Sequence, residues 1–232
     1  MLYSVTSLFR SLISDLPSFL LSLPVILLAL SAHEAAHGWA AWKLGDPTAR
    51  NLGRLTLNPM KHLDPIGAIA MVLFHFGWAK PVPINARNFR NPRRGMALSA
   101  LAGPAANLLL GFLGVILTRL YLFIGDRLGL FYTENAFGAR IAALVYIFFL
   151  LFAQLNVSLA IFNLIPVPPL DGSRILLIFL PPKTYFGIMR YERYIQIALI
   201  IALWLGLLTT PLSYLVSWTM SGMDFLVSWI PY

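Results

Sequence analysis

The chain has 232 residues, of which 59% are hydrophobic and only 11% are charged, and its mean hydropathy is +0.76. Because soluble domains carry about a quarter charged residues, this composition excludes a soluble globular protein and predicts an integral membrane protein. The chain contains no cysteine, which excludes disulfides and thiolate metal ligands. The net charge of +8 resides mainly in short connections, as topology signals do, so we predict no nucleic-acid partner.

The N-terminal part is predicted to form a surface segment followed by the first membrane span. Residues 1–16 are weakly amphipathic and are expected to lie on the membrane surface. Residues 17–42 form the span, with Pro24 inside it. The apolar run continues for about 25 residues without a small-residue cleavage site, so a removable signal peptide is not expected.

The end of this span carries His33, Glu34 and His37 in the pattern H-E-x-x-H. Residues four apart share one face of an α-helix, so the two imidazoles are directed to a common point. This is the pattern of zinc hydrolases, in which the glutamate takes a proton from a water molecule. Ionisable groups in a hydrophobic span cost roughly 2.5–3.5 kcal/mol on insertion scales, which favours a functional role. The alternative is an interface pair of histidines that bond to backbone or lipid headgroups without a metal.

Residues 43–65 are basic and rich in turn residues, with a short strand predicted at 52–57. The next apolar stretch, residues 66–77, would rise only about 18 Å as a helix, short of the bilayer core of about 30 Å. A re-entrant or tilted short helix is therefore expected there.

Residues 77–83 are predicted to be extended, because Pro81 and Pro83 exclude a helix interior. An extended edge near a metal site can pair with the backbone of a peptide substrate. On this basis the candidate substrate-binding residues are Trp78, Lys80, Val82 and Ile84. The alternative is that the segment is an ordinary connector.

Two longer apolar helices follow, at residues 95–124 and 141–165, with a polar connection between them. The small residues from Gly103 to Asn107 favour close helix packing, and Asn107 is interpreted as a hydrogen-bonding group between helices. The second helix must end at a run of prolines that begins at Pro166. This break places Asn163 and Asp171 at the mouth of the following segment.

The last part of the chain contains a basic stretch at residues 183–193 and two closely spaced spans at 194–209 and 211–230. The predicted fold is therefore an all-α polytopic membrane protein with about five or six transmembrane helices. It includes the short re-entrant or tilted helix and a small extended or β segment near the candidate site. We expect one domain over residues 1–232, comprising the N-terminal segment 1–16, a core of about 17–181 and C-terminal helices at 182–232.

A catalytic zinc site usually has three protein ligands and one open position, so a third ligand is needed beside the two histidines. Asp171 is the best candidate, because an unpaired carboxylate at a helix break between apolar segments would be costly. Spacing alone leaves other ligands open, and these are His62, Asp64, His75 and Glu134.

Two motifs about 130 residues apart resemble the signature of the site-2 protease family, the intramembrane zinc metalloproteases of peptidase family M50. The first is the H-E-x-x-H pattern at residues 33–37, and the second runs from Asn163 through the prolines to Asp171 and Gly172. The segments at 77–83 and 103–107 are also similar to the compact bacterial members, which lack PDZ and CBS domains. The resemblance covers about residues 28–176.

This resemblance implies that one Zn²⁺ is bound by His33, His37 and Asp171, that Glu34 is the general base, and that Asn163 helps to hold the substrate carbonyl or oxyanion. It also implies a transmembrane-helix protein as the substrate, cleaved within the lipid bilayer. Basic loops at 43–65 and 80–94 indicate a multi-pass protein of the cell membrane with its site towards the cytoplasm. Alternative functions are a transporter or channel, or an inactive relative that binds membrane helices.

Overall fold

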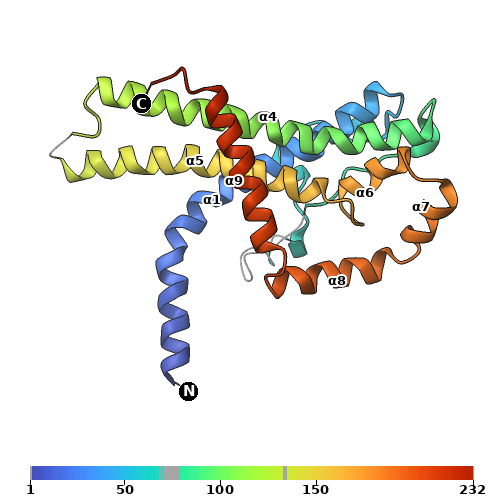
Figure 1. Cartoon of the computed structure of the whole chain (residues 1–232), viewed down its shortest axis with the longest axis horizontal. Coiled ribbons are helices and arrows are strands. Elements are labelled where there is room, and N and C mark those ends of the chain that lie inside the picture. The colour runs from blue at the N-terminus through green and yellow to red at the C-terminus, as the bar shows by residue number, and fades with distance from the viewer. Residues whose placement is uncertain (1, 68, 70–78, 133–134, 232) are drawn as a thin grey trace.

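The computed structural model describes residues 2–67, 69, 79–132 and 135–231 (Figure 1). These residues form helices and loops without a named strand, which confirms the all-α class. The helices are α1 (Leu2–Lys43), α2 (Thr48–Asn51), α4 (Pro92–Arg127), α5 (Ala136–Leu164), α6 (Asp171–Ile175), α7 (Pro182–Met189), α8 (Glu192–Trp204) and α9 (Thr209–Leu226), and the 3-10 turns are η1 (Pro59–Lys61), η2 (Ala86–Asn88) and η3 (Leu176–Ile178).

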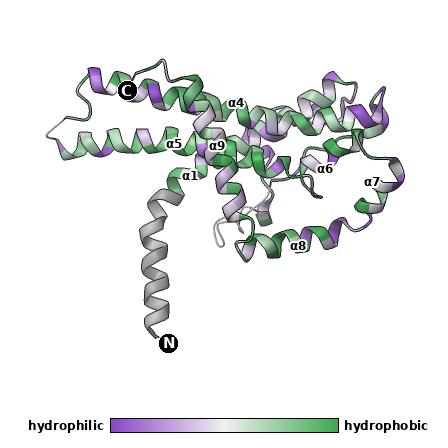
Figure 2. Cartoon of the chain, viewed as in Figure 1, coloured by the Kyte–Doolittle hydropathy of each residue, from purple (hydrophilic) through white to green (hydrophobic). Residues whose placement is uncertain are grey.

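Three helices are long and apolar enough to cross a membrane, namely Leu20–Lys43 within α1, α4 and α5. Apolar residues cover most of the length of α5 and the middle of α4 (Figure 2). The helices α8 and α9 pass the same test only as a pair bent by 81°, so the described residues hold three or four candidate spans. The prediction of separate spans at 194–209 and 211–230 is not met, because α8 has 13 residues and rises only about 20 Å. Most of the predicted re-entrant helix at 66–77 lies outside the described residues.

The central packing unit consists of α4 with α1 and α5 on its sides, and α4 and α5 run antiparallel (Figure 1). A Cβ at Gly114 would lie 2.8 Å from Cα of Ala153, and one at Gly111 would lie 2.6 Å from Cγ2 of Val157. These two glycines therefore let the α4 and α5 backbones approach closely, as small residues do in membrane helix pairs.

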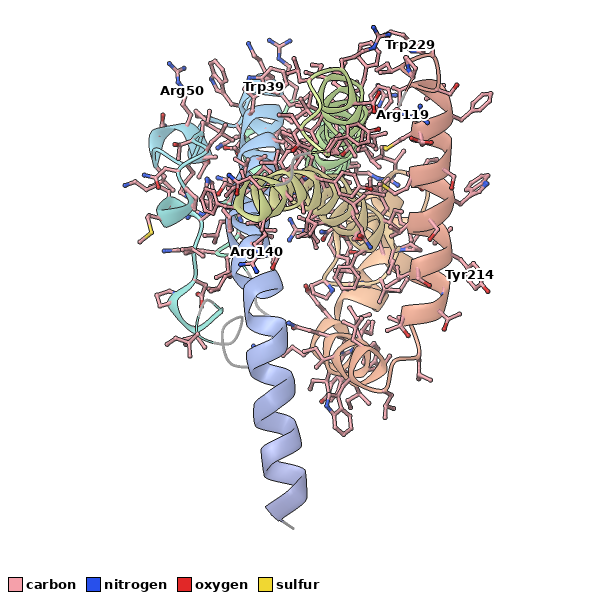
Figure 3. The ribbon with its side chains drawn as sticks, turned by 90° about the vertical axis from the view of Figure 1, so that its left-hand side faces the viewer. Trp39, Arg50, Arg119, Arg140, Tyr214 and Trp229 are labelled. Atoms are coloured by element: carbon pink, nitrogen blue, oxygen red, sulfur yellow. The ribbon has the colours of Figure 1, made fainter. Side chains whose placement is uncertain are left out.

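An ion pair fastens α9 to the central unit. The buried Arg119 lies between α4 and α9 (Figure 3) and donates from Nε and Nη2 to the two carboxylate oxygens of Asp224, each at 2.6 Å. Its Nη1 donates to the backbone oxygen of Ile230 at 2.9 Å. A two-point guanidinium–carboxylate contact satisfies a charge that would otherwise be costly among apolar helices.

The connection between α1 and α4 is non-helical where the sequence predicts extended backbone. Residues 80–85 lie outside any helix, and the preceding Ala79 forms an isolated antiparallel bridge with Leu63. The predicted strand at 52–57 is wrong. Gly53 adopts a φ of +64° in the turn that ends α2, and the following residues pair with no strand among the described residues.

A buried carboxylate holds this connection against the end of α1. Asp46 accepts hydrogen bonds from the backbone N of Asn85 and the Nδ2 of Asn88, both at 2.7 Å. It also accepts from the backbone N and hydroxyl of Thr48. Burial alone would raise the pKa of the Asp46 carboxyl, but these hydrogen bonds outweigh burial and lower the pKa below its ordinary value. The ionised side chain therefore joins α1, α2 and η2.

Candidate metal centre

The structure brings His33 and His37 of α1 together with Asp171 at the start of α6. The Nε2 atom of His33 lies 2.9 Å from Nε2 of His37 and 3.0 Å from Oδ2 of Asp171, and Nε2 of His37 lies 3.2 Å from the same oxygen. Both histidines are buried. Across the described ranges, this is the one group of histidine and acidic side chains whose atoms converge closely enough to hold a metal ion.

Hydrogen bonds on the far side of each ring determine which nitrogen of each histidine faces Asp171. The Nδ1 atom of His37 lies 2.7 Å from the backbone oxygen of Ser99, which can only accept, so Nδ1 carries the proton. The Nδ1 atom of His33 lies 2.6 Å from Oδ1 of Asn107 and donates in the same way. Such outer partners select the tautomer and orient the ring of a metal-binding histidine.

A chain of buried amides sets which end of the Asn107 side chain faces His33. Nδ2 of Asn156 donates to the backbone oxygen of Phe152 at 2.8 Å, so its Oδ1 is left to accept. Nδ2 of Asn107 donates to that Oδ1 at 2.8 Å and to the backbone oxygen of Ala29 at 3.1 Å. With both amide hydrogens committed, Asn107 presents its oxygen to His33. The chain connects α1, α4 and α5 behind the site.

The donor set fits a divalent cation. With the proton of each neutral imidazole on Nδ1, both Nε2 atoms direct lone pairs at each other and at the Asp171 carboxylate. The three atoms all lie within 4.8 Å of one another, and their lone pairs repel unless a proton or a metal ion lies between them. Two imidazole nitrogens and one carboxylate oxygen are also the ligand types of a catalytic zinc site.

Two glycines make room for this convergence. A Cβ at Gly103 would clash with Cε1 of His37 and lie 2.7 Å from Cε1 of His33, so α4 can approach the rings only without a side chain there. A Cβ at Gly172 would clash with the backbone oxygen of Leu164. Gly172 therefore lets the first turn of α6 close onto the end of α5, which brings the adjacent Asp171 to the histidines.

Glu34 and the connecting segment line a cavity of about 150 Å³ at the three converging side chains. Oε2 of Glu34 accepts a hydrogen bond from the backbone N of Val82 at 2.8 Å. Nδ2 of Asn163 donates to the backbone oxygen of Leu159 one helical turn earlier, at 3.0 Å. The full lining is His33, Glu34, His37, Pro81, Val82, Ile84, Ala100, Asn163, Pro169, Asp171 and Arg174.

The remaining sequence candidates lie elsewhere or serve other contacts. Lys80 does not line the cavity, and its backbone N donates to the oxygen of His62 while its own oxygen accepts from Arg54 Nη2. His62 is buried and donates from Nε2 to the backbone oxygen of Thr56. Asp64 accepts from the backbone N of Gly67, as a turn residue does. Three further candidates, Trp78, His75 and Glu134, lie outside the described residues.

One charged residue that lines the cavity was missed at the sequence level. Arg174 lies one turn after Asp171 in α6 and forms no ion pair with another described residue. The signal that could have found it was a single arginine between the Asp171–Gly172 motif and an apolar run, where a charged side chain is costly without a role.

Residues 21–208 of the chain match peptidase family M50. A Bacillus subtilis (strain 168) protein named as the zinc metalloprotease YwhC is 40% identical over 195 residues, which cover 84% of this chain and 83% of that protein. A Mycolicibacterium smegmatis protein named as the zinc metalloprotease Rip2 is 31% identical over 170 residues, or 72% of this chain. Its Mycobacterium tuberculosis (strain H37Rv) namesake is 29% identical over 181 residues, or 75% of this chain. The matches span 60% and 63% of these two mycobacterial proteins. No solved structure matches the chain.

The fold and the site define an integral membrane protein of the metallopeptidase class. The chain belongs to peptidase family M50, which confirms the predicted membership of the site-2 protease family. Membership makes it a metalloendopeptidase and implies zinc as its cofactor, in agreement with the His33, His37 and Asp171 group.

Gly103→Ala is expected to weaken zinc binding at least about tenfold, because the new Cβ would displace both imidazoles from their positions. Elemental analysis of the purified protein after competition with a chelator measures this loss. Gly222→Ala is the matched control, since a Cβ at that helical position meets nothing within 4 Å. Unchanged zinc content in Gly103→Ala would contradict the close packing of α4 on the rings.

Asn156→Leu is expected to weaken zinc binding by about tenfold, although Asn156 contacts neither histidine. The substitution removes the acceptor for one Asn107 amide hydrogen, so the Asn107 side chain can rotate and release the His33 tautomer. Titration with a zinc chelator provides the measurement. Thr118→Val, which removes a half-buried hydrogen bond within α4 away from the histidines, should keep wild-type affinity. Equal affinity in both variants would rule out orientation of His33 by the amide chain.

Proposed function

We propose that this protein is a zinc-dependent intramembrane endopeptidase that cleaves transmembrane segments of membrane proteins, with residues 1–232 acting as one catalytic domain. The observation that carries the proposal is the convergence of His33, His37 and Asp171 beside Glu34 in a cavity bordered by three candidate spans, α1, α4 and α5. The membership of family M50 supports the reaction class. The partners in this proposal are a transmembrane-helix substrate and the lipid bilayer.

In the proposed mechanism His33, His37 and Asp171 would hold the zinc ion. Zinc held there would lower the pKa of a water molecule to near 7 and would polarise the carbonyl of the substrate. Asn107 and the Ser99 carbonyl hold the proton of each imidazole on Nδ1, which leaves both Nε2 atoms free to act as ligands. These outer contacts keep the ligands arranged while the substrate enters and leaves.

Glu34 is the proposed general base. Its Oε2 is oriented by the backbone N–H of Val82 at 2.8 Å, which leaves Oε1 to take a proton from the attacking water. Glu34 then returns this proton to the leaving amine. The carboxylate lies close to the ligands because it directly follows His33 in α1 and lines the same cavity.

Asn163 is the proposed donor to the developing oxyanion. One amide hydrogen is held by the backbone oxygen of Leu159, which orients the side chain and leaves the second hydrogen for the substrate. A contact of this kind contributes about 2.7–4 kcal/mol to transition-state stabilisation in other hydrolases. Asn163 lines the same cavity as Glu34.

The proposed substrate must unwind locally before cleavage, because helix hydrogen bonds occupy its backbone carbonyls. Extended backbone at Val82 and Ile84 lines the cavity and offers replacement partners. Basic residues concentrate in the connections at 43–65 and 80–94, so the positive-inside rule favours a cell-membrane protein whose site lies towards the cytoplasm.

Glu34→Gln is expected to abolish peptide cleavage while one zinc per chain remains bound, because the amide cannot accept the proton but leaves the ligands intact. Asp171→Ala is expected to lose most of the zinc. Cleavage of a membrane-substrate peptide in detergent and elemental analysis measure the two properties separately. Full activity of Glu34→Gln would refute its role, and full zinc in Asp171→Ala would return His62 and His75 to consideration as the third ligand.

Arg174 is proposed to bind the carboxylate that cleavage creates, because it is the cationic side chain on the wall of the cavity. A product-like peptide with a free C-terminal carboxylate should inhibit the enzyme about tenfold more strongly than its amidated form. Arg174→Gln should remove this preference with zinc content unchanged, whereas the exposed Arg193→Gln should retain it. A preference that survives in Arg174→Gln would exclude this contact.

A further inference from the structure

A second cavity lies where the end of α1 meets the start of α4, and it shares no residue with the metal centre. Its volume is about 440 Å³, and three cationic residues line it, Lys43, Arg90 and Arg94. The other lining residues are Leu44, Gly45, Phe89, Asn91, Gly95 and Leu98. The cavity therefore combines positive charge with apolar surface.

The charge of this cavity is not balanced by acidic residues. Lys43, Arg90 and Arg94 form no ion pair within the described part of the chain. The sequence contains no aspartate or glutamate between Asp64 and Asp126. Asp46 lies near the cavity, but it is buried and already accepts four hydrogen bonds. The three cations therefore lack a counter-ion among the described side chains.

The three cationic residues are exposed, and close contacts hold the backbone on which they lie. Gly45 has a φ of +112°, and a Cβ there would lie 3.2 Å from the backbone oxygen of Asn88. The buried ring of Phe89 covers Gly95 so closely that a Cβ would clash with its Cγ. These contacts fix the turn after α1 against the start of α4.

The cavity lies at a membrane surface, because the α1 span ends at Lys43 and the α4 span begins at Pro92. The Nζ atom of Lys43 lies 4.7 Å from the ring centroid of Trp42 and 5.7 Å from that of Trp39. Trp39 is exposed at the outer edge of the molecule (Figure 3). Tryptophans are enriched at the headgroup level of membrane proteins, and Leu98 on α4 offers apolar surface next to the charges.

We propose that this cavity binds the phosphate group of an anionic phospholipid. Lys43, Arg90 and Arg94 surround the phosphate, and the start of an acyl chain follows the apolar surface at Leu98. Basic pockets between membrane helices bind anionic headgroups by the same combination of charge and apolar contact. The neighbouring Arg93 does not take part, because its Nη2 donates to the backbone oxygens of Leu180 and Ile178.

Native mass spectrometry of the full chain in detergent tests this proposal by counting bound lipids during titration. One phosphatidylglycerol is expected to bind more tightly than phosphatidylcholine. Replacing Lys43, Arg90 and Arg94 together by Gln should weaken that first lipid at least about tenfold. The matched control replaces Arg140, Lys183 and Arg193 by Gln, which removes the same charge at exposed sites outside the cavity, and should bind the lipid as the wild type does. Arg140, labelled in Figure 3, lies near the start of α5, at the end of the antiparallel α4–α5 pair away from the start of α4 (Figure 1).

A second set of variants separates loss of binding from loss of folding. The combined exchange Lys43→Arg, Arg90→Lys and Arg94→Lys keeps the charge of the cavity and should retain the lipid. Equal weakening in the cavity and control variants would overturn the proposal in favour of general surface charge. Inorganic phosphate that binds as tightly as the lipid would overturn it in favour of a free-phosphate site. Equal affinity for phosphatidylcholine would exclude a headgroup site altogether.

Discussion

The close approach of α4 to α1 at Gly103 is the constraint on which the candidate metal centre depends. The two imidazoles occupy the space that a side chain at this position would fill. The same approach brings the Ser99 carbonyl and the Asn107 amide to the far side of the rings, where they fix both tautomers. A larger separation of the two helices would lose the outer hydrogen bonds and the ligand geometry together. The absence of a Cβ at Gly103 therefore determines both the close packing of α4 on α1 and the arrangement of the two imidazoles.

Helix α4 also organises the parts of the molecule that lie away from the metal centre. Gly111 and Gly114 bring it against α5, whose Asn156 completes the amide chain behind His33. Arg119, further along α4, holds α9 through Asp224. An apolar side chain gains little free energy when it moves from lipid into a helix interface. Close backbone contacts and buried polar pairs must therefore determine which helices pack together. The small and polar residues of α4 are therefore as informative about this fold as its long apolar stretches.

How well the sequence predicts a structural feature depends on how far apart in the chain the contacting residues lie. Helical spacing was sufficient to direct His33 and His37 to one point, since both lie within one turn of α1. The proximity of Asp171 depends on a fold over more than a hundred residues, and spacing alone left it among several candidates. Arg174 and the link from Asn156 to His33 were missed for the same reason, because both depend on contacts between helices. The prediction of a strand at 52–57 failed because these residues have no partner strand among the described residues. The local composition from which the strand was predicted does not show whether a partner strand exists.

The connecting segment at 80–85 shows how the fold constrains a substrate that would pair with it. Pro81 and Pro83 carry no N–H, and the N–H groups of Lys80 and Asn85 are bound by His62 and Asp46. The Val82 N–H is bound by the carboxylate of Glu34, so Ile84 alone among these six residues retains an N–H that no described group accepts. Under the proposed function, a substrate carbonyl that pairs with Val82 must compete with Glu34 for the same hydrogen. Pairing through the Ile84 N–H instead would leave intact the Val82 hydrogen bond that orients Glu34, so the substrate and the base would not share one donor.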